Sequence, residues 1–372
     1  MSEAIRLVTI CTRSRLAEAA VFAGSLDRVH PGVPRTLYLA EREVTAEDRA
    51  CGWTVRPASA LPVPDPERFL FQYMPLQLCC ALKPFALEAE LREPGAAGAV
   101  YVDGDMLALA PFLDGVEAAW READVWLTPH LRKPLPASND YPLLRMGAYN
   151  AGFMAVRGAS DGLSFLRWLQ PRLARDCVRD LEHGLFDDQK WLDLAAVCPG
   201  VRPWRQAGIN VGHWNLHEHV FADQAGGGIL MDGTTPLALF HFSGLTPEAL
   251  SRHAVSAPVP PPIQALAGRY RAELSEKRAR FPGDARYSFG GFDDGSLILP
   301  VHREAVRQGS VKTVRPFGAR AEVEAAATGM CPPAGSYEEA AAGDIQLRRL
   351  RTHPVIGRVW RFWKRWVNHD LP

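Results

Sequence analysis

A run of β-forming residues that ends in two carboxylates constrains the fold of this chain most. Residues 99–105 read Ala-Val-Tyr-Val-Asp-Gly-Asp, and the apolar part is typical of a buried strand in a parallel sheet. Ligands of open α/β sheets bind outside the carboxyl ends of the strands. On an extended chain Asp103 and Asp105 point the same way, and they repel each other unless a positive group lies between them. Their hard oxygen atoms suit Mg²⁺ or Mn²⁺, although Asp and Gly are also common in plain turns.

Strands and helices alternate along the rest of the chain. This order predicts an α/β fold with a mixed, mostly parallel sheet flanked by helices. Within it, Asn150 and Gly152 favour a turn before a buried strand. Residues 229–231 and 237–242 are expected to form a hairpin, and Pro84 and Pro171 to bend or end their helices. The expected strands are 5–11, 36–40, 99–102 and 124–128, and the expected helices are 17–26, 67–91, 161–175 and 263–280.

The overall composition excludes several classes of protein. The chain has 372 residues with 47% hydrophobic and 23% charged residues, which predicts a globular fold. Lys plus Arg and Asp plus Glu both number 42, so net charge gives no argument for nucleic-acid binding. Seven cysteines without Cys-x-x-Cys spacing indicate a reducing compartment. No signal peptide and no run of about 18 apolar residues is found, so we expect a cytoplasmic protein.

Further polar residues stand where strands or helices begin or end. Thr12 and Arg13 follow the first strand, where a base or a phosphate commonly binds, although Arg13 could equally be a solvated loop charge. Lys83 could face solvent or aim at a phosphate. Asp188 and Gln189 open a helix, where an acid is favoured by the helix dipole alone or faces a reacting centre. His241 ends an apolar strand, where a histidine is a core residue or an emerging metal ligand.

Six of these motifs together resemble a known family. The chain resembles a GT-A-fold glycosyltransferase and is close in motif order to GT8-type bacterial sugar transferases over residues 5–250. The resemblance rests on the strand followed by Cys-Thr-Arg (11–13), Lys83, Val-Asp-Gly-Asp (102–105), Tyr-Asn-Ala-Gly-Phe (149–153), Asp-Asp-Gln (187–189) and His-Phe-Ser-Gly (241–244).

The resemblance implies a nucleotide-sugar donor, with a UDP-sugar favoured, and an Mn²⁺ or Mg²⁺ ion. It implies a saccharide or lipid-linked acceptor and no nucleic-acid partner. Carried over by motif, the metal ligands are Asp103, Asp105 and His241, and the catalytic pair is Asp188 and Gln189. The residues expected to contact the donor are Thr12, Arg13, Lys83, Asp103, Asn150, Gly152 and His213.

The reaction expected from this resemblance places negative charge on a departing diphosphate, which a bound cation stabilises as a Lewis acid. An inverting enzyme needs a carboxylate base at the acceptor hydroxyl, for which Asp187 or Asp188 could serve. A retaining enzyme lets the leaving phosphate take the proton, and the resemblance leans toward retention. Lys190 stands where the family often has an acid, and Leu-Thr-Pro-Glu (245–248) replaces its usual Lys-Pro-Trp. A binding protein of the same fold without catalysis is the alternative.

Three regions are expected along the chain. Residues 1–256 form the sugar-transferase domain, 257–344 a C-terminal extension that begins with prolines, and 345–372 a basic tail helix. In the tail, apolar residues that include Trp360, Trp363 and Trp366 face one side and cations the other. This pattern is typical of a helix at a membrane interface, so the protein could lie at the inner face of the cell membrane. Docking of the tail on the main domain is the alternative.

Overall fold

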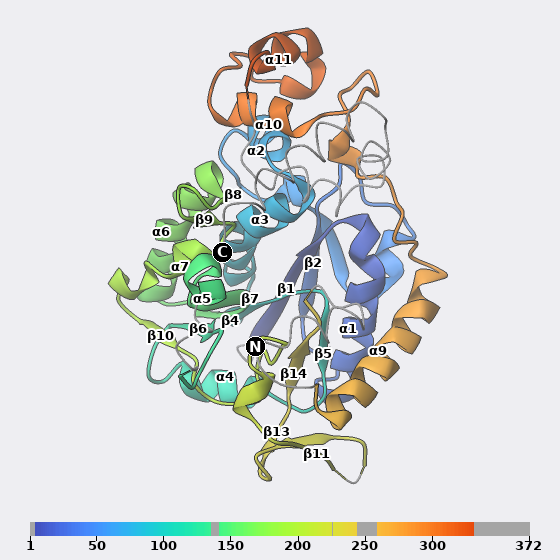
Figure 1. Ribbon diagram of the computed structural model, residues 1–372, viewed down its shortest axis with the longest axis vertical. Coiled ribbons are helices and arrows are strands. Elements are labelled where there is room, and N and C mark those ends of the chain that lie inside the picture. The colour runs from blue at the N-terminus through green and yellow to red at the C-terminus, as the bar shows by residue number, and fades with distance from the viewer. Residues whose placement is uncertain (1–3, 135–140, 225, 244–258, 331–372) are drawn as a thin grey trace.

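The computed structural model describes residues 4–134, 141–224, 226–243 and 259–330 (Figure 1). The strands are β1 (Ala4–Cys11), β2 (Arg35–Leu39), β3 (Thr54–Pro57), β4 (Ala96–Val102), β5 (Met106–Ala108), β6 (Val125–Pro129), β7 (Tyr149–Arg157), β8 (Arg179–Asp180), β9 (Leu185–Phe186), β10 (Val201–Pro203), β11 (Phe221–Asp223), β12 (Ile229–Met231), β13 (Thr235–Pro236) and β14 (Leu239–His241). The α-helices are α1 (Leu16–Val29), α2 (Pro66–Gln72), α3 (Pro75–Leu91), α4 (Leu113–Ala119), α5 (Tyr141–Met146), α6 (Ser160–Asp176), α7 (Gln189–Leu192), α9 (Pro261–Arg278), α10 (Pro300–Arg307) and α11 (Arg320–Ala327).

One seven-stranded sheet forms the centre of the molecule, in the order β10-β6-β7-β4-β1-β2-β3. The pairs β4-β1, β1-β2, β2-β3 and β10-β6 are parallel. Strand β7 runs antiparallel to both of its neighbours, β4 and β6. The expected α/β fold with a mixed, mostly parallel sheet is therefore confirmed.

Helices cover both faces of this sheet because its strands are apolar on both sides. On β4, Ala99 and Tyr101 belong to the core under α3 and α6, whereas Val100 and Val102 belong to the core under α1. Helix α9 lies along the outer side of α1 (Figure 1). The carboxyl end of β4 therefore emerges between two packed layers.

Neither helical proline ends its helix, so that part of the expectation is wrong, while a bend at either proline stays a prediction. The segment 67–91 is two helices, α2 and α3, and their boundary falls before Pro75 rather than at Pro84. Helix α3 continues through Pro84 and α6 through Pro171. These two helices pack on each other and on the sheet, and the apolar area buried there outweighs the backbone hydrogen bond that each proline removes.

The turn expected around Asn150 and Gly152 is also wrong, since both residues lie inside β7. The Asn150 Oδ1 atom accepts a hydrogen bond of 2.9 Å from the Gly152 backbone N–H. Beside them, the pairing of β6 with β7 shifts register between Leu127 and Thr128. Asn150 and Gly152 thus form a hydrogen bond at a local irregularity of β7. Pairing with the neighbouring strands keeps β7 extended there.

The expected hairpin of residues 229–231 with 237–242 is confirmed only at its start: β12 pairs with β13 across residues 232–234, and the Leu237 N–H donates to the Ile229 carbonyl. Strand β12 pairs with β11 and with the two-residue strand β13. Strand β14 instead pairs antiparallel with β5, with His241 opposite Met106. A hairpin pattern in the sequence shows only that two strands are near in the chain, whereas β5 offers β14 a partner far from it. This pairing carries His241 to the end of β4.

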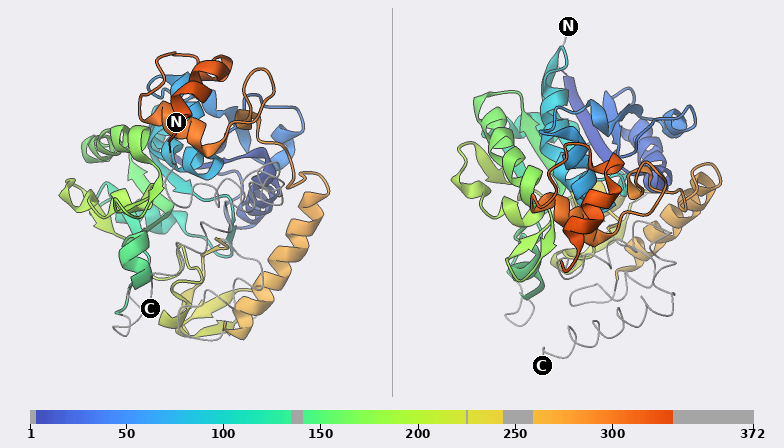
Figure 2. Two further views of the ribbon diagram at one scale, coloured as in Figure 1. Left: turned by 45° about the horizontal axis from the view of Figure 1, so that its top comes forward. Right: turned by 90° about the horizontal axis from the view of Figure 1, so that it is seen from above.

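The C-terminal part packs against the first part. Helix α9 contacts α1, and α10 contacts α2 (Figure 2). Phe289, Phe292 and Phe317 lie in the same hydrophobic core as residues of α3 and β4. The expected boundary near residue 256 and the tail helix 345–372 fall outside the described residues, so the division into domains stays a prediction. Within the described ranges, no helix combines the length and the hydropathy needed to cross a membrane.

Candidate active site

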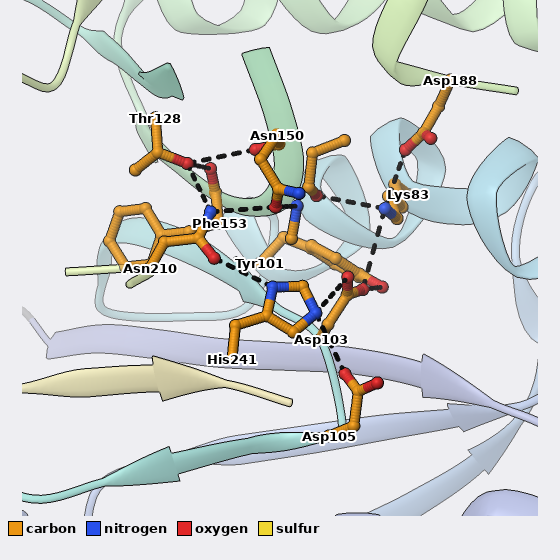
Figure 3. A network of polar contacts seen from close by, with 12 residues as sticks. Lys83, Tyr101, Asp103, Asp105, Thr128, Asn150, Phe153, Asp188, Asn210 and His241 are labelled. Atoms are coloured by element: carbon orange, nitrogen blue, oxygen red, sulfur yellow. Dashed lines mark hydrogen bonds and ion pairs between the residues drawn. The ribbon is translucent and has the colours of Figure 1, made fainter. Parts of the chain in front are cut away.

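Asp103, Asp105 and His241 meet at the carboxyl end of β4 (Figure 3). Residues 103–105 form the short link from β4 to β5, and β14 brings His241 beside it. The His241 Nε2 atom lies 3.1 Å from Oδ1 of Asp105 and 3.5 Å from Oδ2 of Asp103. One ligand atom from each residue lies within 4.8 Å of the others. The structure thus brings together the three residues expected to hold a metal.

The charges of this cluster depend on one another. Burial alone would raise the pKa of Asp105, but His241 and Arg15 hold it below its usual range. Burial would likewise lower the pKa of His241, but Asp105 and Asp103 raise it above its ordinary value. The metal-free cluster therefore favours a proton on the imidazole between two carboxylates. A divalent cation would take the place of that proton, because metal ligands must be deprotonated.

The donor set fits Mn²⁺ or Mg²⁺. Carboxylates suit both ions, whereas an imidazole nitrogen is a better ligand for a transition metal than for Mg²⁺. The His241 side chain is 3% exposed and that of Asp103 29% exposed. The histidine therefore closes the buried side of the cluster, and Asp103 opens toward solvent.

Lys83 supplies the positive charge deepest in this site. It lies on α3, and its Nζ atom is 2.7 Å from Oδ2 of Asp188 and 3.7 Å from Oδ1 of Asp103. It donates a hydrogen bond of 3.0 Å to the carbonyl of Ala151 and lies over the ring of Tyr101. Burial would lower the pKa of Lys83, but Asp103 and Asp188 raise it well above its ordinary value. Lys83 therefore stays charged and faces inward rather than toward solvent.

The two neighbouring acids before α7 have different partners. Asp188 is the residue at the N-terminus of α7, but its side chain makes no capping hydrogen bond and reaches Lys83 instead. Asp187 adopts a left-handed backbone with φ +49°, and its Oδ2 lies 2.5 Å from Nη2 of Arg179. Of the two acids, Asp188 is the one linked to Asp103 through Lys83, so helix capping alone does not explain it.

Gln189 lies at the start of α7. Its Nε2 donates a hydrogen bond of 3.0 Å to the carbonyl of Met146 at the end of α5. The amide is half-buried and anchored to this neighbouring helix. Its expected place at the reacting sugar stays a prediction.

Thr12 and Arg13 follow β1 as expected. The guanidinium of Arg13 makes two hydrogen bonds of 2.9 Å to the carboxylate of Asp48. The Thr12 hydroxyl lies 3.0 Å from that of Ser14. Arg13 is thus a paired residue rather than a solvated charge, and its role in donor binding stays a prediction.

The remaining expected donor residues cluster around the His241 ring. A side-chain carbon at Gly152 would lie 2.5 Å from Cε1 of His241, so the ring packs directly on the bare backbone of β7. Asn150 is buried beside them. His213 contacts the ring of Trp214 edge-on, and Trp214 in turn contacts the ring of His241. Asn150 and Gly152 therefore lie beside His241 and His213 one ring away from it, and the contact of these three residues with a donor stays a prediction.

Sequence reasoning missed three polar residues that support this cluster. Thr128, His130 and Asn210 are all buried, and each is joined to Asn150 by a hydrogen bond. Asn210 lies in residues 209–216, a segment rich in polar groups, but nothing in that segment marks it above its neighbours. An asparagine between two β-branched residues was the one available signal.

Comparisons with known proteins found one curated relative and a set of similar structures. No family model matches the chain. The uncharacterized protein YfnF of Bacillus subtilis (strain 168) is 29% identical over 176 residues, which cover 45% of this chain and 56% of that relative. The match thus spans about half the length of the relative.

The similar solved structures include two glycosyltransferases. The galactosyltransferase LgtC in complex with donor and acceptor sugar analogs is 13% identical, with 73% of this chain and 95% of that chain covered and a TM-score of 0.43. The glycosyltransferase GlyE of Streptococcus pneumoniae TIGR4 is 10% identical, with 77% and 66% covered and a TM-score of 0.40.

Proposed function

We propose that this protein is a metal-dependent glycosyltransferase that moves a sugar from a nucleoside diphosphate to a saccharide or lipid-linked acceptor. One observation carries the proposal: Asp103, Asp105 and His241, from two distant parts of the chain, place their ligand atoms within 4.8 Å of one another. This cluster stands at the carboxyl end of a central strand, where ligands of such sheets bind. The order of the motifs along the chain supports the same reaction.

Asp103, Asp105 and His241 would hold the Mn²⁺ or Mg²⁺ ion. When bound, such an ion stabilises the negative charge that develops on the departing diphosphate. The solvent-facing side of Asp103 is where the donor would approach. We favour a UDP-sugar as donor, on the resemblance of the motifs.

The protein's own residues would position the sugar. Lys83 holds the Asp188 carboxylate in place, and a fixed carboxylate accepts hydrogen bonds from sugar hydroxyls. In the transfer, the bond between the anomeric carbon and the phosphate oxygen breaks. A new bond forms to the acceptor oxygen, whose proton passes to the leaving phosphate in a retaining enzyme. We favour retention, which NMR of the anomeric configuration in the first product would test.

A panel of thermal shifts tests the proposal. The melting temperature is measured with UDP, GDP, ADP and UDP-sugars, each with Mn²⁺ or with EDTA, because a ligand of the folded state raises it by mass action. Asp105→Asn removes one proposed ligand, and Asp114→Asn removes an exposed carboxylate on α4 as its matched control. We expect one nucleotide to raise the melting temperature of the wild type and of Asp114→Asn when Mn²⁺ is present, but not when EDTA is present. The same nucleotide should not raise the melting temperature of Asp105→Asn under either condition.

Two results would contradict the proposal. The absence of a shift with every nucleotide argues against donor binding altogether. A metal-dependent shift with one sugar nucleotide, but without turnover in a screen of saccharide and lipid-linked acceptors and without hydrolysis of the donor, favours a binding protein of the same fold.

The tail helix 345–372 remains a separate proposal, because it lies outside the described residues. A basic and aromatic helix at a membrane surface would suit a lipid-linked acceptor. Deletion of residues 352–372 should then release the protein from vesicles of anionic lipid. Unchanged sedimentation with the vesicles would show that the tail does not bind them.

A further inference from the structure

The two nitrogen atoms of the His241 ring face different surroundings (Figure 3). Its Nε2 faces the carboxylates of Asp103 and Asp105, and its Nδ1 lies 2.9 Å from Oδ1 of Asn210. A neutral imidazole carries its hydrogen on one nitrogen only, and the other nitrogen is the one that can bind a metal. The partner of Nδ1 therefore decides whether Nε2 is available as a ligand.

The direction of the hydrogen bonds begins at a group that can only donate. The backbone N–H of Gly152 donates to Oδ1 of Asn150 at 2.9 Å. Because this N–H needs an acceptor, the atom of the Asn150 amide that faces it is the oxygen, and the other atom is the nitrogen. The same oxygen lies 3.0 Å from the amide of Asn210, so that amide presents its nitrogen, Nδ2, to Asn150.

A second acceptor fixes Asn210 further. The hydroxyl of Thr128 donates to the backbone carbonyl of Asn150 at 3.0 Å, so its oxygen is free to accept. Nδ2 of Asn210 lies 2.6 Å from that oxygen. Both amide hydrogens of Asn210 thus have acceptors, and its Oδ1 faces His241. Because Oδ1 can only accept, Nδ1 of His241 must carry a hydrogen.

The other branch of the network has the same direction. Nδ1 of His130 lies 2.9 Å from the carbonyl of Gly147, which can only accept, so the hydrogen of His130 is on Nδ1. Its Nε2 then accepts from Nδ2 of Asn150 at 3.4 Å. Burial lowers the pKa of His130 to about 4, so the ring is neutral near pH 7. Three backbone groups, the N–H of Gly152 and the carbonyls of Asn150 and Gly147, therefore set the donors and acceptors up to His241.

We propose that Asn210 is a positioning residue of the metal site, which holds His241 with hydrogen on Nδ1 and presents Nε2 to the cation. The inference rests on the metal dependence of the proposed function and goes beyond its ligand set. Such a partner behind a ligating histidine typically changes metal affinity by about 10- to 100-fold. The ring is held on its other side by Gly152, where a side-chain carbon would collide with it.

The backbone of Asn210 indicates the variant that tests this role. Its φ is +53°, a left-handed conformation that glycine adopts without strain. Asn210→Gly therefore removes the amide and keeps the backbone. Asp65→Gly is the matched control, because Asp65 has a φ of +42° and its side chain pairs with Arg68 at the start of α2. Asn210→Asp keeps an acceptor for Nδ1 but loses the two amide hydrogens that Thr128 and Asn150 accept.

Two measurements are made on the full chain. Calorimetric titration with Mn²⁺ gives the affinity, which should fall about 10- to 100-fold in Asn210→Gly and stay at the wild-type value in Asp65→Gly. Nitrogen-15 NMR of labelled histidine in the Mg²⁺-loaded chain gives the position of the hydrogen. We expect the nitrogen-15 signal of a hydrogen-bearing Nδ1 of His241 in the wild type and in Asn210→Asp. This signal should be lost in Asn210→Gly.

The outcomes separate this inference from the proposed function. Hydrogen on Nε2 of His241 in the Mg²⁺-loaded wild type overturns the inference without any variant, so the test stands even if Asn210→Gly does not fold. Wild-type Mn²⁺ affinity in a folded Asn210→Gly also overturns it, while metal binding itself stands. A wild-type chain that binds neither ion overturns the metal site and, with it, the role of Asn210.

Discussion

The ammonium group of Lys83 and the carboxylate of Asp188 form a buried ion pair, 2.7 Å long, that joins α3 to the start of α7. Their side chains are 3% and 6% exposed. Removing such groups from water costs several kcal/mol for each ion. The attraction between the two charges and the hydrogen bonds around them must therefore offset this cost. The pair lies beside Asp103. It connects the candidate metal ligands to the start of α7, where the proposed catalytic residues Asp188 and Gln189 lie.

Breaking this pair from one side should destabilise the fold. Lys83→Met keeps an unbranched side chain that is one atom shorter, but leaves the Asp188 carboxylate buried without its cation. We expect the free energy of unfolding to fall by about 3–5 kcal/mol, measured by urea denaturation. The double variant Lys83→Met/Asp188→Asn should recover at least about 1 kcal/mol of this loss, because no unpaired charge remains. A loss in the double variant equal to the sum of the losses in Lys83→Met and Asp188→Asn would show that the pair is not coupled.

Gly152→Ala should displace the His241 ring. The new carbon would lie 2.5 Å from Cε1 of His241 and 2.8 Å from Oδ1 of Asn150, so the ring or the strand must shift. We expect a loss of about 1–3 kcal/mol in unfolding free energy and at least about tenfold weaker Mn²⁺ binding, from denaturation and calorimetry.

Gly24→Ala is the control for that substitution. Gly24 lies inside α1, and a carbon added there meets no atom within 4 Å. Alanine favours a helix over glycine, so we expect a gain of about 0.5–1 kcal/mol and wild-type Mn²⁺ affinity. Equal Mn²⁺ affinity in the two alanine variants would contradict the close packing of His241 on β7.

His130 should make the stability depend on pH. Burial lowers its pKa to about 4, with His213, Asp193 and His241 as the titratable groups that face it. In the unfolded chain its pKa is about 6.5, so stability is fully present above that value and is lost as the pH falls toward 4. Between about pH 7 and pH 5 the loss amounts to about 2 kcal/mol. His130→Gln should lack this part of the pH dependence, and identical pH profiles of the two proteins would show that His130 is not held neutral.

Asp187 and Asp188 should respond differently to the same substitution. Asparagine tolerates the left-handed backbone of Asp187, so Asp187→Asn weakens mainly the contact with Arg179, at about 1–3 kcal/mol of stability. Asp188→Asn should lower kcat at least about hundredfold, the size typical of a group that acts on the reacting sugar. Transfer assays and urea denaturation of both variants separate the two roles. A larger loss of kcat in Asp187→Asn would reverse the assignment.

Local sequence was sufficient for the sheet and for two of the three candidate metal ligands, Asp103 and Asp105. Continuous apolar runs depend on neighbouring residues in the chain, so the strand before Asp103 and the mostly parallel sheet could be predicted from local pattern. The position of Asp103 and Asp105 at the carboxyl end of that strand then makes these two carboxylates candidate ligands. Lys83 and Asp188 were singled out as candidates, although nothing in their spacing showed that they pair.

Tertiary structure decided how these candidates meet. The pairing of β14 with β5 brings His241 to Asp105, and strand pairing between segments so far apart is not encoded in either segment alone. The role inferred for Asn210 depends on a hydrogen-bond direction set by the backbone of Gly152. Local sequence determines which residues can donate, accept or bind a metal. Only the packed chain determines which of them share a site, because contact and burial arise from residues distant in sequence.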